Sequence, residues 1–190
     1  AIETFTPARV LRTARNDDAW VPLPLDVAST LFGRINKVDA RWFVDLDLAS
    51  AWAGRLSFYD DVQLLRVFNP FWSSEDLVVH YLIRGEQLFR LNGVSPPIHE
   101  VNAGSLKLTP ANVLDYVRFF CFFVRGEEGP FYVCETPDDP LLAPDGDGRV
   151  AGELLPYLRP AAIVETEEAS YKVEANLMYS NTLFSAILMV

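Results

Sequence analysis

Hydrophobic and polar residues alternate most regularly between residues 171 and 179. One set is apolar or aromatic and the other mostly polar: Tyr171, Val173, Ala175, Leu177 and Tyr179 against Lys172, Glu174, Asn176 and Met178. This period of two predicts a strand with one face in the core. Further strands are predicted over 161–166 and 182–190, and the short connections favour an antiparallel meander. Because the last of these is apolar on both faces, we expect it to be an inner or covered strand.

Earlier in the chain, the pattern predicts four more strands, over 41–48, 62–68, 77–84 and 87–91. The first of them alternates Trp42, Val44, Leu46 and Leu48 with more polar positions. The last two are separated by Gly85 and Glu86 alone, which predicts a type II′ hairpin because glycine can supply the positive φ.

A helix is predicted over about 110–124, where Thr109 can cap the first turn and Pro110 suits the first helical position. Between Val113 and Val124 only Asp115 and Arg118 are charged. A helix that is apolar nearly all round must be covered on most of its surface. We therefore expect either a curved sheet wrapped around it, or a sheet on one side and a partner chain on the other.

These elements predict an α+β fold: one antiparallel, β-rich domain of about seven to eight strands around one dominant buried helix, ending in a β-meander. The single domain is expected to span residues 1–190. The pattern over 1–75 is the hardest to interpret, and this part could form an N-terminal subdomain.

Composition narrows the class of protein. Of the 190 residues, 50% are hydrophobic and 13% aromatic, which is enough to offset the entropy of ordering the chain. The net charge of −10 and the scattered basic residues disfavour nucleic-acid binding. No apolar run reaches 18 residues, so no membrane span is expected. Two cysteines, both in apolar segments, favour buried thiols and a cytoplasmic location.

Candidate chemistry is sparse. The two histidines are His80 and His99, and their surroundings lack the ligand spacing of a metal site. The segment 95–102 is the most unusual, because two prolines precede the acid–base side chains His99 and Glu100 and the polar Asn102. The pattern favours a surface crossover loop here over a catalytic site. No metal and no cofactor are expected, and the acidic residues between Glu135 and Asp147 are interpreted as a solvated loop.

Arginines offer a second candidate site. Arg84, Arg90 and Arg118 lie on predicted elements that could be neighbours, and with Asn102 they could hold a carboxylate or phosphate ligand. Arginines on an acidic protein more often pair with its own Asp and Glu, which is the interpretation we favour.

Two functional hypotheses follow, and neither specifies an activity. The favoured one is a noncatalytic domain that forms a homo-oligomer or binds a protein partner through the apolar helix or the last strands. The alternative is an enzyme or small-ligand binder, with a Phe-lined pocket between helix and sheet that uses His99, Glu100, His80 and an arginine.

Overall fold

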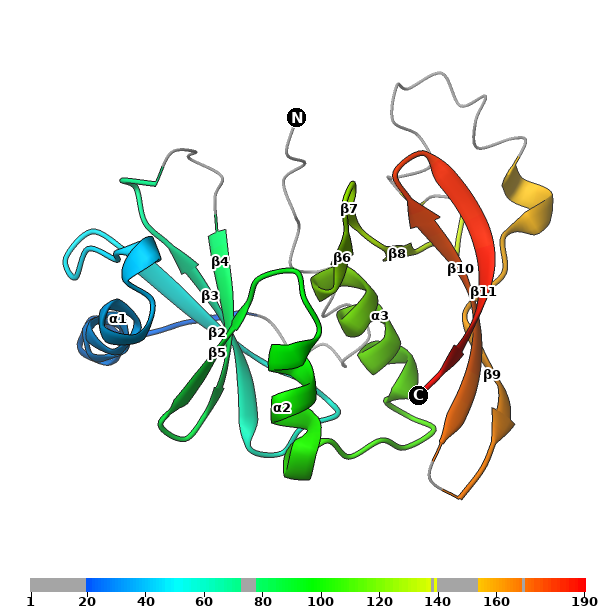
Figure 1. Ribbon diagram of the computed structural model, residues 1–190, viewed down its shortest axis with the longest axis horizontal. Helices are drawn as coiled ribbons and strands as arrows, with labels where there is room; N and C mark the ends of the chain where they lie inside the picture. Colours follow the sequence, from blue (N-terminus) through cyan, green and yellow to red (C-terminus); the bar gives the residue numbers. More distant parts are fainter. Residues whose placement is uncertain (1–19, 73–77, 138, 140–153, 169) are drawn as a thin grey trace. The chain divides into compact units, whose positions relative to one another are not determined.

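The computed structural model describes residues 20–72, 78–137, 139, 154–168 and 170–190 (Figure 1). The chain divides into two compact units, one built from the residues up to 92 with 96–107, the other from 93–95 with 108–190. The expectation of one domain stays a prediction. The first unit extends beyond residue 75, the end of the possible N-terminal subdomain.

The first unit is built on a five-stranded antiparallel sheet in the order β1-β2-β3-β4-β5. Its strands are β1 (Val21–Pro22), β2 (Ser50–Arg55), β3 (Val62–Phe68), β4 (Val78–Arg84) and β5 (Gln87–Leu91). The strands predicted over 62–68, 77–84 and 87–91 are therefore confirmed. Gly85 between β4 and β5 has a φ of 55°, as the hairpin turn requires.

Helix α1 (Leu25–Val38) packs on one face of this sheet (Figure 1). Its buried side chains recur every three or four residues and form one face of the helix: Ala28, Leu31, Phe32 and Ile35. They pack against Leu65 and Val67 of β3 and Val79 and Tyr81 of β4.

The segment 41–48 is not a strand, so this prediction was wrong. Residues Ala40–Trp42 form a 3-10 helix (η2), and a turn follows. The Asp45 carboxylate accepts hydrogen bonds from the backbone N–H of Asp47 and Leu48, both at 2.9 Å. This local bonding by an aspartate side chain competes with strand pairing and closes the turn.

The segment 95–102 is not a loop either. From Pro96 onward it belongs to α2 (Pro96–Ser105), which is kinked at Ala103 and Gly104. Prolines are tolerated in the first turn of a helix because the N–H groups there have no helical acceptor. No cis peptide bond occurs among the described residues.

In the second unit, α3 (Val113–Phe123) begins three residues later than predicted, with Asn112 rather than Thr109 preceding its first turn. The Asn112 side chain accepts from the Thr109 N–H at 2.8 Å, so residues 109–112 form a turn before the helix. Val113, Val117 and Cys121 pack on the C-terminal sheet.

This sheet contains β8 (Tyr132–Val133), β9 (Ala162–Thr166), β10 (Tyr171–Tyr179) and β11 (Thr182–Met189). Strand β10 pairs with all the others, and β9, β10 and β11 form the predicted meander. A 3-10 helix, η4 (Leu155–Tyr157), precedes β9, and β6 (Arg125–Gly126) pairs with β7 (Gly129–Pro130).

The α+β class with antiparallel sheets is confirmed. Seven of the eleven strands in the described part of the chain have five or more residues, in line with the seven to eight expected. None of the described helices is long and apolar enough to cross a membrane.

Candidate functional site

The acid–base candidates do not share one environment. His99 and Glu100 are exposed on α2, whereas His80 on β4 is only 6% exposed. Asn102 is partly buried and accepts a hydrogen bond from the Tyr59 hydroxyl. This arrangement separates two surface side chains from a histidine in the sheet.

Arg84 is bonded to its own unit. Its Nη1 donates to the Ser105 hydroxyl at 3.2 Å and to the carbonyls of Val101 and Ala103, both at 3.4 Å. Nε and Nη2 donate to Gln87. A guanidinium at the carbonyl end of a helix satisfies groups that have no helical donor, so Arg84 has a structural role there.

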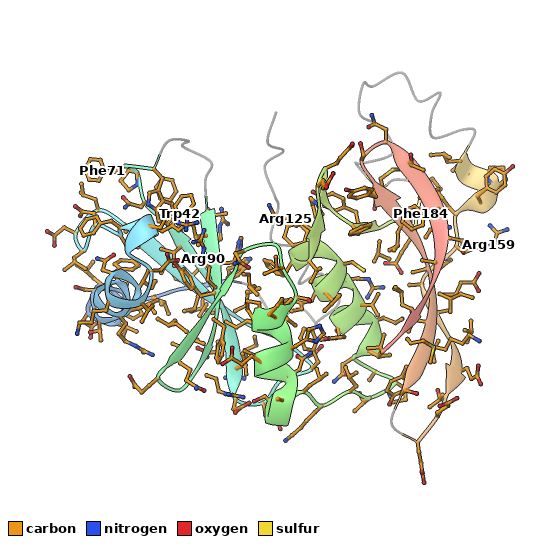
Figure 2. All side chains as sticks on the ribbon, viewed as in Figure 1. Trp42, Phe71, Arg90, Arg125, Arg159 and Phe184 are labelled. Carbon is orange, nitrogen blue, oxygen red and sulfur yellow. The ribbon has the colours of Figure 1, made fainter. Side chains whose placement is uncertain are left out.

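The other two candidate arginines pair with carboxylates. Arg90 Nη1 lies 3.1 Å from the Asp39 carboxylate, and its guanidinium stacks over Trp42 at 4.9 Å (Figure 2). Arg118 donates twice to Glu135, at 2.8 and 3.0 Å, and once to Asp115 at 3.2 Å. Glu135 belongs to the acidic segment that we expected to be solvated. Asp138, Asp145 and Asp147 of that segment lie outside the described residues.

Neither thiol is placed for nucleophilic chemistry. Cys121 and Cys134 are both buried, and they do not form a disulfide bond with each other. Burial raises the pKa of Cys121 to about 11, so this thiol is protonated at neutral pH. Nor does the described part of the chain bring together three His, Cys, Asp or Glu side chains that could hold a metal ion.

Strand β11 is the least protected element of the second unit. It pairs with β10 on one side, and no other described strand pairs with it on the other. The expectation of an inner or covered last strand was therefore wrong: Ile187 and Met189 are 63% and 65% exposed. We call this free side of Thr182–Met189 the β11 edge.

The register identifies which backbone groups point outward from the β11 edge. Tyr171 N donates to Val190 O at 2.8 Å, and Val190 N donates to Tyr171 O at 2.9 Å. In an antiparallel ladder, pairs bonded in this way alternate with pairs that are not. Counting back from Val190, the even-numbered residues of β11 bond to β10. The N–H and C=O groups that point outward are those of Leu183, Ser185, Ile187 and Met189.

Other strand edges in the described part of the chain carry protective features. Strand β9 has five residues, contains Glu165 and has a register shift against Lys172 and Val173 of β10. Strand β5 contains Arg90, and the two-residue β1 ends in Pro22. Charges, bulges, proline and short length all discourage edge pairing. Strand β11 has eight residues with no charge, proline or glycine.

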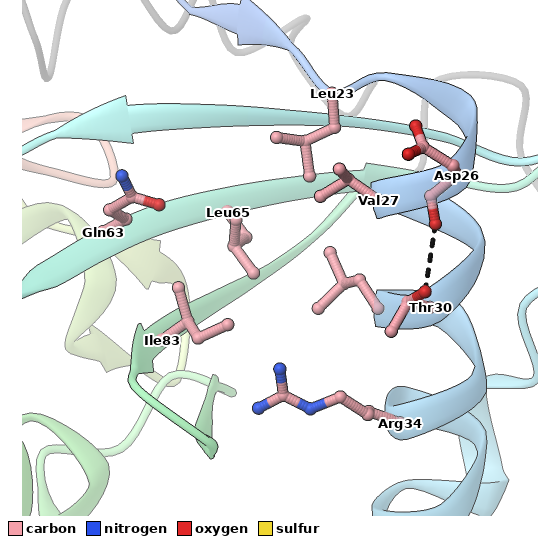
Figure 3. A pocket seen from close by; sticks show the side chains of 9 residues that line it. Leu23, Asp26, Val27, Thr30, Arg34, Gln63, Leu65 and Ile83 are labelled. Carbon is pink, nitrogen blue, oxygen red and sulfur yellow. Dashed lines mark hydrogen bonds between the residues drawn. The ribbon is translucent and has the colours of Figure 1, made fainter.

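A pocket of about 330 Å³ lies in the first unit, between α1 and the sheet (Figure 3). The walls are mostly apolar side chains of α1, β3, β4 and the segment before α1: Leu23, Val27, Leu31, Leu65 and Ile83. Four polar residues complete the lining: Asp26, Thr30, Arg34 and Gln63. None of the predicted site residues lines this pocket.

A larger pocket, of about 770 Å³, lies in the second unit between η4 and the outer face of β10 and β11. Its cation, Arg159, is labelled in Figure 2. Arg159 Nη1 donates to the carbonyls of Pro156 and Leu158 at 2.9 and 2.7 Å, and its backbone N–H donates to Asn176. These polar groups bind η4 to the sheet, which is a structural role.

Comparison of the chain with protein-family models, with curated proteins and with solved structures found no match in any of the three.

Proposed function

We propose that this protein is a noncatalytic association domain that forms a homodimer through the β11 edge. The observation that supports this proposal is an eight-residue, uncharged edge strand whose outward backbone groups pair with no described strand. Such an edge is a template for another strand. A second copy supplies a strand of the same length and chemistry, and twofold-symmetric homodimers are the commonest soluble oligomers.

Twofold symmetry restricts the register of the pairing. Residues opposite one another across the axis must lie on the same face, so their numbers must both be even or both be odd. With Ala186 on the axis, Ser185 pairs with Ile187 of the second copy and Leu183 with Met189. All four outward-facing residues of each copy then form hydrogen-bonded pairs. The two C-terminal sheets become one continuous antiparallel sheet.

Side-chain burial adds to the backbone pairing. Ile187 and Met189 are mostly exposed in the single chain, and in this register they lie beside Ser185 and Leu183 of the second copy. Burying a large aliphatic side chain completely contributes roughly 1.5–3 kcal/mol. Because a single strand pair forms a narrow interface, dimerisation is expected at micromolar rather than nanomolar concentrations.

The test is the molar mass of the purified protein in solution, measured by light scattering after size exclusion and by sedimentation equilibrium. At about 100 µM we expect twice the chain mass of 21.4 kDa, falling towards the chain mass on dilution. A chain mass at every concentration would refute the proposal.

Two substitutions locate the interface. Ser185→Pro removes an N–H that points away from β10, and Ile187→Lys places a charge on the edge. Both variants are expected to be folded monomers by circular dichroism and molar mass. The matched control is Val164→Lys, because Val164 is also exposed, at 50%, but lies on β9 at the opposite side of β10. This control should remain a dimer. Dimers of unchanged affinity in both edge variants would place the interface elsewhere.

A further inference from the structure

Among the residues that the structure describes, the lining of the pocket under α1 combines an apolar interior with the cation of Arg34. Its apolar walls come from α1 on one side and from β3 and β4 on the other, and Arg34 extends from α1 towards Ile83 (Figure 3). Ligand pockets in proteins are typically apolar with a few polar groups that orient the ligand, and occupy about 300–1,000 Å³. At about 330 Å³, this pocket suits a small molecule.

Arg34 has unused hydrogen-bonding capacity. Its Nη2 donates to the Gly85 carbonyl at 3.3 Å, and its Nε lies 3.7 Å from the Glu86 carboxylate, beyond hydrogen-bond distance. Glu86 is 93% exposed at its side chain, so water screens this pair strongly. A guanidinium has five N–H donors, and one long bond uses one of them. The rest can bind a carboxylate in the two-pronged geometry that arginine favours.

Asp26 and Arg34 give opposite charges to the two ends of the pocket. Asp26 lies eight residues before Arg34 on α1, which is about 12 Å along the helix at 1.5 Å per residue. The anionic end therefore repels a carboxylate, while the cationic end attracts it. The apolar side chains of Val27 and Leu31 lie along α1 between the two charges.

We propose that this pocket binds a small monocarboxylate of about eight carbons with an apolar body. The carboxylate pairs with Arg34, the Gln63 side chain at the pocket wall can donate to it, and the apolar body packs along Leu31, Leu65 and Ile83. This inference is independent of the proposed dimerisation, since the pocket is built from the first unit and the β11 edge from the second.

The probe is octanoate, titrated into the full chain by isothermal calorimetry and by ligand-observed NMR. Octylamine and octanamide have the same number of carbon atoms as octanoate, with a cationic or a neutral head in place of the carboxylate. We expect octanoate to bind, octanamide to bind more weakly and octylamine not to bind. Absence of octanoate binding at about 10 mM, where even millimolar affinity is detectable, would overturn the proposal. Equal binding of octanoate and octylamine would overturn it as well.

Variants locate the site. Arg34→Gln should weaken octanoate binding by roughly 10- to 100-fold, the range for losing hydrogen bonds to a charged group. Val27→Phe fills the pocket from a residue that is 49% exposed, so it should abolish binding without unfolding the protein. Arg41→Gln, at an exposed arginine outside the pocket, is the control and should bind as the wild type does. Octanoate binding that survives both pocket variants would place the ligand elsewhere.

Discussion

The three candidate arginine side chains all bind groups of their own chain. Arg84 bonds the carbonyl end of α2, and Arg90 pairs with Asp39. Arg118 joins α3 to the segment after β8 through Glu135. The sequence predicted such pairing as the commoner outcome for an acidic chain, but which carboxylate each arginine meets depends on tertiary packing.

The Arg118–Glu135 pair should contribute measurably to stability. Glu135 receives two hydrogen bonds from Arg118, and the backbone N–H of Ala161 donates a third, at 3.0 Å. Glu135→Gln keeps the shape but removes the charge. We expect it to lower the free energy of unfolding by about 1–3 kcal/mol in urea denaturation.

The control for this measurement is Glu165→Gln. Glu165 pairs with Lys172 at 3.2 Å, but the two side chains are 55% and 37% exposed. An exposed pair contributes little, so a loss below about 0.5 kcal/mol is expected. Equal losses in the two variants would contradict the structural role of Glu135.

Burial of Cys121 makes stability fall at alkaline pH. Its pKa is raised to about 11 in the folded protein because burial disfavours the thiolate, against an ordinary value of 9.0. Between these values the unfolded chain releases the proton while the folded chain retains it, so the free energy of unfolding falls with rising pH. The stabilisation is complete below pH 9 and is lost by about pH 11.

Cys121→Val tests this effect, since valine has a similar size and does not titrate. Urea denaturation at pH 8 and at pH 11 should show a larger loss for the wild type than for the variant, by up to about 3 kcal/mol. If the free energy of unfolding fell by the same amount in both proteins, Cys121 would not contribute to the pH dependence of stability.

Among the elements, those with a strong local pattern were predicted correctly. The β4–β5 hairpin and the β9–β10–β11 meander have regular strand patterns and short connections. For such elements, the side-chain alternation and the turn residues determine both the strands and their neighbours.

Elements in which side chains bind the nearby backbone were predicted less well. Asp45 closes a turn in a segment that alternates like a strand. Asn112 forms a turn that delays the start of α3. Both side chains form hydrogen bonds with the nearby backbone that compete with regular structure. The hydrophobic periodicity of the sequence does not reveal this competition.

The sequence pattern also did not predict the position of β11 at the edge of its sheet in the described part of the chain. A strand that is apolar on both faces is typical of a sheet interior, yet no further described strand pairs with β11. A second copy of the chain would restore the interior environment that the pattern indicates. The apolar character of both faces of β11 therefore accounts for the wrong prediction and also supports the proposed dimer.

For the whole molecule, the site could not be predicted from the sequence because its residues are distant in the chain. The pocket joins Arg34 with Gln63 and Ile83, which neighbour one another only after α1 has packed on the sheet. A weak signal was present: Asp26 and Arg34 flank Val27 and Leu31 at helical spacing. His99 and Glu100, the acid–base candidates that follow the two prolines, are exposed and do not line this pocket.

The central claim for the whole molecule is that β11 pairs with a second copy of itself. It is tested most directly by amide hydrogen exchange along β11, measured by NMR at dimer-forming and at dilute concentrations. The amides of residues 184, 186 and 188 bond to β10 and should be protected from exchange at both concentrations. The amides of Leu183, Ser185, Ile187 and Met189 should exchange at least about tenfold more slowly in the concentrated sample. Fast exchange of these four amides at high concentration would contradict the account.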